Sequence, residues 1–255
     1  MTNTNGTETR VTIFVGPTLP LDIARSQLDA TFLPPVSQGD VYRATQQRPQ
    51  VIGIIDGYFE QVPAVWHKEI LYAMQEGIHV LGSASMGALR AAELAPFGMR
   101  GVGAIYEAFA SGALEDDDEV AVAHGFVDEA YVNLSVAMVD IRATLSAAEK
   151  QGILSASTHQ ALIDVAKSLY YPDRVYPVIL SRAQQSGIAP EELERLRAWL
   201  PVGQVHQKRA DAMALLKAIK TLLSPDLEPF RASYTLNPTR MWHATLHGGD
   251  GGSSG

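Results

Sequence analysis

A serine within a run of small residues is the part of this sequence best suited to chemistry. The run Gly82-Ser83-Ala84-Ser85-Met86-Gly87 follows an apolar segment and leads into a stretch rich in Ala, Leu, Arg and Glu. A nucleophile elbow has the pattern Gly-x-Ser-x-Gly and joins a strand to a helix. Ser83 stands here at the first glycine position, but small residues still leave room for a carbonyl to reach Ser85. The run therefore predicts a nucleophilic serine at a strand-to-helix turn.

The first turn of the following helix would offer this serine free backbone N–H groups and a positive dipole end. Met86 N–H is one candidate oxyanion donor, and Gly57 N–H is a second. Two simpler interpretations stay open. Ser85 could only cap the helix, as serine often does, or the turn could bind an anion such as phosphate. The second is weaker because the chain has no Gly-rich Walker pattern.

A nucleophilic serine needs a base, and the residues leave the choice of base open. His67 and Lys68 are neighbours on a predicted helix. A partly buried lysine can act as a base, and histidine titrates close to neutral pH. Adjacent helical residues point in different directions, so we expect only one of the two to face the site. For each, the alternative is a solvated surface position.

Asp56 and Arg90 are further candidates for the site. Asp56 lies at the predicted end of a strand, where it could orient a base or bind a metal. Asp-Gly is also a favoured turn pair, but its place at the expected active edge favours a functional role. Arg90 could hold a carboxylate or simply pair with Glu93 or Glu69.

An acidic run followed by a histidine is the last candidate feature. Glu115–Glu119 precedes His124, a pattern that could bind a metal or polarise the imidazole. Carboxylates also favour the N-terminus of a helix, so we expect a solvated helix start and assign no metal.

The elements that must position these residues alternate between strand and helix. Apolar or β-branched runs predict strands at 11–15, 51–55 and 78–81, with a weaker one at 31–33. Helical spacing falls at 21–28, 40–47, 63–76 and 86–94. Such alternation predicts a parallel sheet in a Rossmann-like or flavodoxin-like layered sandwich. The residues after its strands, among them Gly16–Thr18, Asp56–Tyr58 and Ser83–Ser85, would then meet at one edge of the sheet.

The second half of the chain is predicted to be mostly helical. We expect helices near 119–150, 157–170, 174–186, 190–199 and 204–223. The expected organisation is a disordered N-terminus at 1–10, an α/β core at 11–118, a helical region packed on that core at 119–224, and a loose tail at 225–255.

Composition excludes several classes of function. The 255 residues carry a net charge of −8 and no basic cluster, which disfavours nucleic-acid binding. The absence of cysteine excludes a thiolate nucleophile, a persulfide and a Cys-ligated metal. Neither a secretory signal nor a membrane-spanning run is found, so we expect a cytoplasmic protein with no membrane partner.

Four segments in order resemble one known family. They are Ile54–Phe59, Val65–Leu71, Gly82–Leu94 and Gly98–Gly103. Through these segments the chain resembles the TfuA-like family. The resemblance begins near Gly16-Pro17 and continues to His124-Gly125, which is about half of the chain.

The resemblance implies a partner of YcaO enzymes in peptide backbone thioamidation. ATP and Mg²⁺ would act on the YcaO partner, so no cofactor is expected here. Sulfur would come from a thiocarboxylated, ubiquitin-like carrier of the ThiS type, which this protein would hydrolyse to release sulfide. The peptide substrate would be an indirect partner only. The residues agree, since a serine with an oxyanion hole suits acyl transfer and a chain without cysteine cannot carry a persulfide.

The expected roles follow from this combination. Ser85 is the nucleophile, Lys68 or His67 the base, and Asp56 the residue that orients the base. Gly57 and Met86 would hold the oxyanion, with Ser83 and Arg90 on the substrate side.

Two other possibilities are kept open. The segment Ala84–Ala88 also looks like the nucleophile segment of Clp-type serine peptidases, in which a histidine follows, and this likeness keeps His124 as an alternative base. The alternative function is a non-catalytic YcaO-binding module that channels sulfide or positions the peptide. A nucleotide-binding role ranks below both, because the chain has no G-x-G-x-x-G turn.

Overall fold

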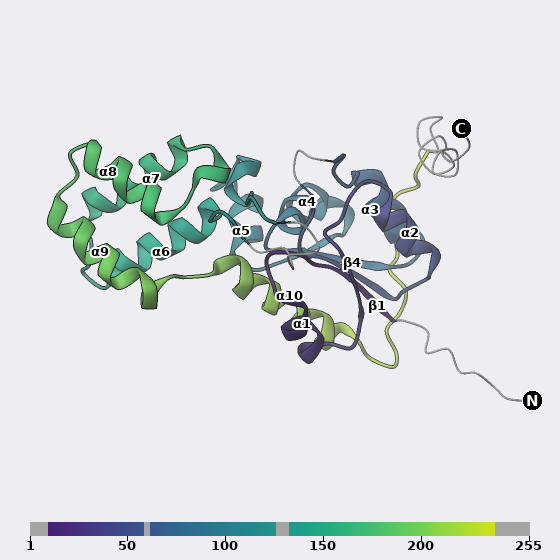
Figure 1. The fold of residues 1–255 in the computed structure, drawn as a ribbon. Helices are drawn as coiled ribbons and strands as arrows, with labels where there is room; N and C mark the ends of the chain where they lie inside the picture. The colour runs from purple at the N-terminus through teal and green to yellow at the C-terminus, as the bar shows by residue number, and fades with distance from the viewer. Residues whose placement is uncertain (1–9, 59–61, 126–132, 238–255) are drawn as a thin grey trace, which may run out of the picture.

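A computed structural model describes residues 10–58, 62–125 and 133–237 of the chain (Figure 1). Five parallel strands form one sheet with the order β2-β1-β3-β4-β5. The strands are β1 Val11–Phe14, β2 Thr31–Leu33, β3 Val51–Ile54, β4 His79–Ser83 and β5 Arg100–Val102. This is the flavodoxin-like order, and it confirms the α/β class predicted from the alternating pattern.

The three central strands are buried on both faces, as a parallel sheet covered by helices requires. Their register is set by pairs such as Val11 with Val51, and Val51 with His79. The β-branched runs of β1 and β3 therefore form the middle of the core. β5 was not predicted, because it is a three-residue edge strand that contains both an arginine and a glycine.

Helices cover both faces of this sheet (Figure 1). The helices of this layer are α1 Leu21–Gln27, α2 Asp40–Gln46, α3 His67–Gln75, α4 Met86–Leu94, α5 Ala104–Ala110 and α10 Gln207–Leu222. α2, α3 and α4 pack on one face, around residues such as Ile52 and Ile54. α1 and α10 pack on the other face, around residues such as Ile13 and Leu215. The last helix within residues 10–237, α10, thus returns to complete the sheet layer.

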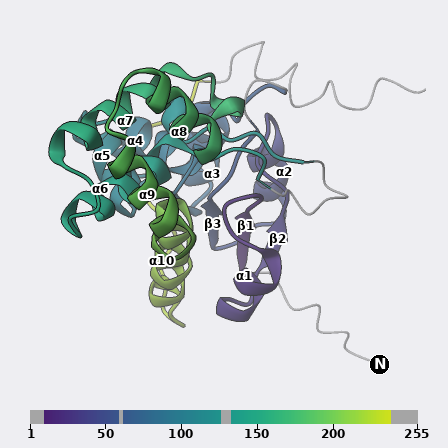
Figure 2. The same cartoon turned by 60° about the vertical axis from the view of Figure 1, so that its left-hand side comes forward.

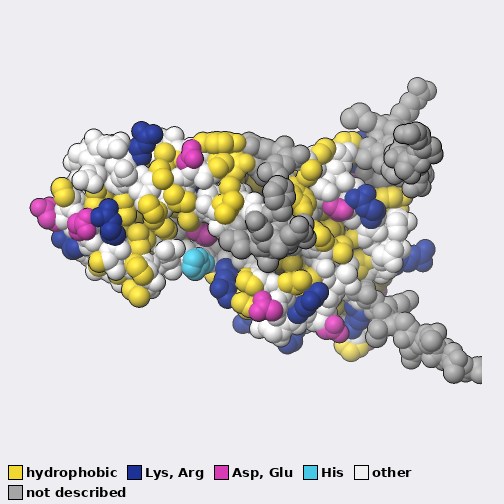
Figure 3. All heavy atoms as spheres, viewed as in Figure 1, with side chains coloured by type: hydrophobic (Ala, Val, Ile, Leu, Met, Phe, Trp, Pro, Cys, Tyr) yellow, Lys and Arg dark blue, Asp and Glu magenta, His cyan; other side chains and the backbone are white. Residues whose placement is uncertain are grey.

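The remaining helices form a bundle beside the sheet layer, with a core of its own. Its members are α6 Met138–Lys150, α7 Ala156–Ser168, α8 Tyr176–Gln185 and α9 Pro190–Gly203, with the short helices η2 Asp117–Glu119 and η4 Tyr171–Asp173 at its border. From the bundle the chain continues directly into α10 (Figure 2). Hydrophobic side chains gather on the bundle surface in the space-filling view (Figure 3).

Three sequence predictions are corrected by the structure. The helix expected at 63–76 begins only at His67. The helix expected from residue 119 begins at Met138, and the acidic run forms ion pairs with Lys167. The tail expected to be loose from 225 is held through 236: Phe230 N–H donates to Gly77 O, and Tyr234 Oη donates to Leu71 O.

Two further points concern the ends of the chain and membranes. The disorder predicted for 1–10 falls almost entirely outside the described residues, as does the tail beyond 237. No helix in the described part of the chain combines the length and the apolar character that crossing a membrane requires.

Candidate active site

A cavity lies at the point where the sheet order reverses. From β1 the chain moves outward to β2, and from β3 it moves the other way to β4, so the carboxyl ends of β1 and β3 leave a crevice. The cavity there measures about 290 Å³. Its sheet-side lining comes from the three predicted segments, through Pro17, Asp56 and Ser85 among others. The structure therefore brings together the three loops that the sequence placed at one edge.

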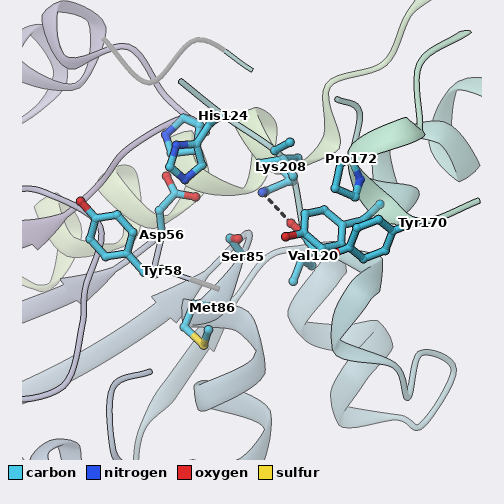
Figure 4. Close-up of a pocket in the computed structure, with 15 residues that line it drawn as sticks. Asp56, Tyr58, Ser85, Met86, Val120, His124, Tyr170, Pro172 and Lys208 are labelled. Atoms are coloured by element: carbon cyan, nitrogen blue, oxygen red, sulfur yellow. Dashed lines mark hydrogen bonds between the residues drawn. The ribbon is translucent and has the colours of Figure 1, made fainter. Parts of the chain in front are cut away.

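The opposite side of the cavity comes from segments far later in the chain. They contribute the backbone around Val120, the ring of His124, residues Tyr170–Pro172 and the side chain of Lys208. Figure 4 shows Asp56, Ser85, His124 and Lys208 around the same space. The site is thus shared between the sheet layer and the residues that border the bundle.

Ser85 stands between β4 and α4, at the N-cap position of the helix. The preceding residue, Ala84, has a left-handed φ of 65°, which turns the chain sharply into the helix. The Ser85 hydroxyl makes no capping hydrogen bond, and no bond to it is found among the described residues. The side chain is 8% exposed and faces the cavity. Helix capping therefore does not account for this serine.

Two glycines explain why the turn can be so tight. A Cβ on Gly87 would lie 1.8 Å from Ile54 O, and a Cβ on Gly82 would lie 2.0 Å from Gly87 O. The backbone of α4 therefore rests directly on the ends of β3 and β4. This close approach fixes the height of Ser85 above the sheet edge.

Two backbone N–H groups accompany the serine. Met86 is the first residue of α4, where N–H groups have no partner within the helix, and Gly57 follows β3 on the neighbouring strand. Both residues line the cavity, and neither N–H donates to another atom among the described residues. Two such N–H groups beside a hydroxyl are the parts that an oxyanion hole requires.

Asp56 makes its hydrogen bonds to the loop that follows β1. Its Oδ2 accepts hydrogen bonds from Gly16 N–H at 2.9 Å and Thr18 N–H at 3.1 Å, and its Oδ1 accepts from Thr18 Oγ1 at 2.5 Å. The carboxylate is 2% exposed and ties the loop after β1 to the end of β3. It holds this loop, and its hydrogen bonds among the described residues go to Gly16 and Thr18 and not to a base on α3.

The structure does not bring the bases predicted on α3 to Ser85. His67 is exposed, and its Nε2 lies 2.7 Å from Glu93 Oε2 at the surface. Lys68 is half-buried, and neither residue is among those that line the cavity.

The side chains of Ser83 and Arg90 bond to other parts of the fold. Ser83 Oγ lies 2.6 Å from Val102 O and 2.9 Å from Asp211 O, and its one proton is shared between these two acceptors, which joins β4 to β5 and α10. Arg90 donates to Val65 O and forms an ion pair with Glu93, so the simpler alternative noted for Arg90 is the one observed.

His124 does reach the cavity. Its Nδ1 lies 2.8 Å from Gly125 O, and its ring centroid lies 6.3 Å from that of Tyr58. The acidic run before it forms ion pairs. Asp118 and Glu119 pair with Lys167, and no group of three or more metal-ligating side chains is found within the described ranges.

Lys208 is the residue that sequence reasoning missed. It lies in the first turn of α10, is 4% exposed, and donates from Nζ to Val120 O at 2.8 Å (Figure 4). Burial lowers the pKa of its ammonium below the ordinary 10.5, and the charges of Asp56 and Asp140 oppose this only in part.

A signal for Lys208 was present in the sequence. The buried positions of α10 are Lys208, Asp211, Ala212, Leu215, Leu216 and Ile219. This is the spacing of an apolar helix stripe, so a lysine at its first position had to be buried or snorkelling.

Comparison with known proteins agrees with the sequence motifs. No curated protein matches the chain in sequence. Residues 56–175 match the family model described as TfuA-like protein. That range begins at Asp56 and includes Ser85 and His124, and it ends before α10 and Lys208. Through residues 56–175, the chain belongs to the TfuA-like family.

Proposed function

We propose that this protein hydrolyses a protein C-terminal thiocarboxylate at Ser85 and supplies the released sulfide to a YcaO partner for peptide backbone thioamidation. One observation carries the proposal: the Ser85 hydroxyl makes no capping hydrogen bond and lines a cavity that is also lined by Met86 and Gly57. Family membership supports the link to the YcaO system.

The chemistry fits these groups. Ser85 Oγ would add to the thiocarboxylate carbon, and the carbonyl oxygen would gain negative charge next to Met86 N–H and Gly57 N–H. The C–S bond then breaks, sulfide leaves, and an acyl-serine remains. Water cleaves this ester, which gives a carboxylate and restores the serine. The sum is thiocarboxylate plus water to carboxylate plus hydrogen sulfide.

The size of the cavity supports a substrate that enters as an extended chain end. The cavity of about 290 Å³ holds the end of an extended chain but not a folded domain. It shares Pro17, Val122 and Lys208 with a neighbouring cavity of about 420 Å³, and it shares Tyr58 and Met86 with one of about 770 Å³. The tail of a carrier protein could therefore lie along this groove with its last carbonyl at Ser85.

Sulfide release by the isolated protein tests the proposal. The purified chain is incubated with a thiocarboxylated ThiS-type carrier, and sulfide is measured without YcaO. We expect steady release, and Ser85→Ala should reduce it by about 10³-fold or more. Ser111→Ala, at an exposed position on the surface, is the matched control and should release sulfide like the unmodified protein.

The same assay addresses the alternative, a non-catalytic module that channels sulfide or positions the peptide. Full release by a folded Ser85→Ala variant contradicts the nucleophile. Release that occurs only when YcaO is added contradicts hydrolysis by this chain and favours the module.

A further inference from the structure

We propose that the C-terminal tail of the carrier protein reaches Ser85 through one particular groove, the cavity of about 770 Å³ between α4 and the end of α7. We call this groove the α4 limb, and its lining includes Val62, Leu89, Arg90, Lys167, Leu169 and Tyr170. The inference rests on the proposed function for the identity of the carrier. It adds the route of the tail and the residues that hold it.

Two grooves border the central cavity, so the route is a choice between them. The second, of about 420 Å³, is called the α10 limb, and its lining includes Leu134, Val136, Val175, Val205, His206 and Arg209. Each groove shares lining residues with the central cavity. Size favours the α4 limb, because an extended protein tail needs more room than a released sulfide ion.

The position of the α4 limb relative to Ser85 is the first argument. It shares with the central cavity the residues Tyr58, Met86, Tyr170 and Tyr171. Met86 follows Ser85 in the chain, and Tyr58 follows Gly57. A carbonyl held by the N–H groups of Met86 and Gly57 therefore has this limb directly beside it. In the view of Figure 4, Met86 and Lys208, which belongs to the α10 limb, lie on opposite sides of Ser85.

The side chains of the α4 limb are the second argument. Tyr170 is 60% exposed and Val62 is 40% exposed, and both line the groove. Leu89 and Leu169 add apolar surface to the same lining. The ring of Tyr170 packs against that of Tyr171, with centroids 4.8 Å apart, which limits its movement. Exposed tyrosine and aliphatic side chains along a groove are typical of a surface that binds a protein segment.

The charges of the α4 limb are largely neutralised within it. Its ion pairs are Arg90 with Glu93, and Asp118 with both Lys167 and Arg174. Asp117, the other charged residue of its described lining, is exposed. Paired charges present little net charge to a bound segment, so this limb suits an uncharged backbone with apolar contacts.

The α10 limb has a different balance of charge. Its described lining holds His206, Lys208 and Arg209 against one acid, Asp140. Cationic side chains attract anions, and the proposed reaction forms hydrosulfide and carboxylate ions. The charges therefore assign the tail to the α4 limb and favour the α10 limb for a released anion.

Photocrosslinking locates the tail directly. The full chain carrying Val62→benzoylphenylalanine is irradiated with the carrier in its carboxylate form, which has no sulfur to release, and crosslinked peptides are identified by mass spectrometry. We expect crosslinks to the last residues of the carrier. Leu134→benzoylphenylalanine, at an exposed apolar position of the α10 limb, is the matched control and should give no crosslink to the tail.

Sulfide release as a function of carrier concentration measures how much these residues contribute. Val62→Glu and Tyr170→Ala should raise the KM for the thiocarboxylated carrier by about tenfold or more, with kcat within about threefold. Tyr170 also lines the central cavity, so Val62→Glu isolates the limb. Leu134→Glu should keep both constants within about twofold. All three positions are exposed, so the variants should fold.

The outcomes keep this inference apart from the proposed function. Tail crosslinks and a raised KM at Leu134, with neither at Val62, overturn the α4 limb as the route. Normal sulfide release with no crosslink at either position, or with an unchanged KM in Val62→Glu, also overturns the route and leaves the proposed function standing. Tail crosslinks at Val62 in a protein that releases no sulfide contradict the proposed function and support the route.

Discussion

Asp56 shows at the scale of a single residue how the active edge is held together. Its carboxylate accepts three hydrogen bonds from the loop after β1, while it belongs to the segment after β3. One side chain therefore joins the two strands between which the sheet order reverses. It also places a negative charge near Lys208. The sequence predicted a functional Asp56, and in the structure this carboxylate holds the loop after β1 against the end of β3.

Replacing this carboxylate should destabilise the fold. In Asp56→Asn, the amide nitrogen replaces an oxygen that faces donors, so at least one buried N–H or O–H loses its acceptor. We expect the free energy of unfolding to fall by about 1–3 kcal/mol, measured by urea denaturation. Thr18→Val, which removes only the hydroxyl donor, should cost less. Equal stability of Asp56→Asn and the unmodified protein would contradict this account.

The residues also show where prediction from sequence reaches its limit. Ser85 and Asp56 follow strands directly, so local pattern was sufficient to place them at one edge. Lys208 reaches the same cavity from the last described helix, and only the return of α10 to the sheet brings it there. His67 and Lys68 are close to Ser85 in sequence, but neither is among the residues that line the cavity.

At the scale of elements, the turn from β4 to α4 determines the geometry of the site. Gly82 and Gly87 let the helix backbone touch the strand ends, and Gly87 N–H donates to Ile55 O at 3.2 Å. Local composition predicted this turn because small residues cluster there. The late start of α6 was not predictable in this way, because local composition does not show that the acidic run pairs with Lys167 of α7 and with Arg174.

Gly87→Ala should damage this junction. The new Cβ would lie 1.8 Å from Ile54 O, and a backbone atom cannot move aside without shifting the helix. We expect the free energy of unfolding to fall by about 1–3 kcal/mol or more. Sulfide release should also be slower, because the Ser85 hydroxyl is displaced. Gly112→Ala is the matched control. It adds a Cβ in open space at a φ of 75°, so it carries only the conformational cost of about 1–2 kcal/mol and should leave Ser85 reactive.

At the scale of the whole molecule, an ion-pair cluster joins the sheet layer to the bundle. Arg174 is 1% exposed, donates to Asp118 O, and pairs with Asp118 Oδ2 at 2.5 Å. Lys167 of α7 pairs with both Asp118 and Glu119, and Arg142 of α6 pairs with Glu119. The acids that looked like a solvated helix start therefore link the residues lining the cavity to α6 and α7.

This cluster should make the stability of the whole molecule depend on pH in acid. Burial acts to raise the pKa of Asp118 and of Glu119, but hydrogen bonds from Lys167, Arg174 and Arg142 outweigh it and hold both below their ordinary values of 3.8 and 4.5. Groups with a depressed folded-state pKa stabilise the fold above their unfolded pKa, so the contribution is complete above about pH 5. It is lost as the pH falls through the lowered folded-state values.

Asp118→Asn tests this link between the two halves. The variant should lose about 1.5–3 kcal/mol at neutral pH, because hydrogen bonds to a charged acceptor are replaced by weaker ones. It should then lose less than the unmodified protein between pH 5 and pH 3, since one titrating group is gone. Urea denaturation across this range measures both effects. Glu115→Gln, at an exposed acid with no ion pair in the described part of the chain, should follow the unmodified protein throughout. Parallel curves for Asp118→Asn and the unmodified protein would show that the junction does not depend on this charge.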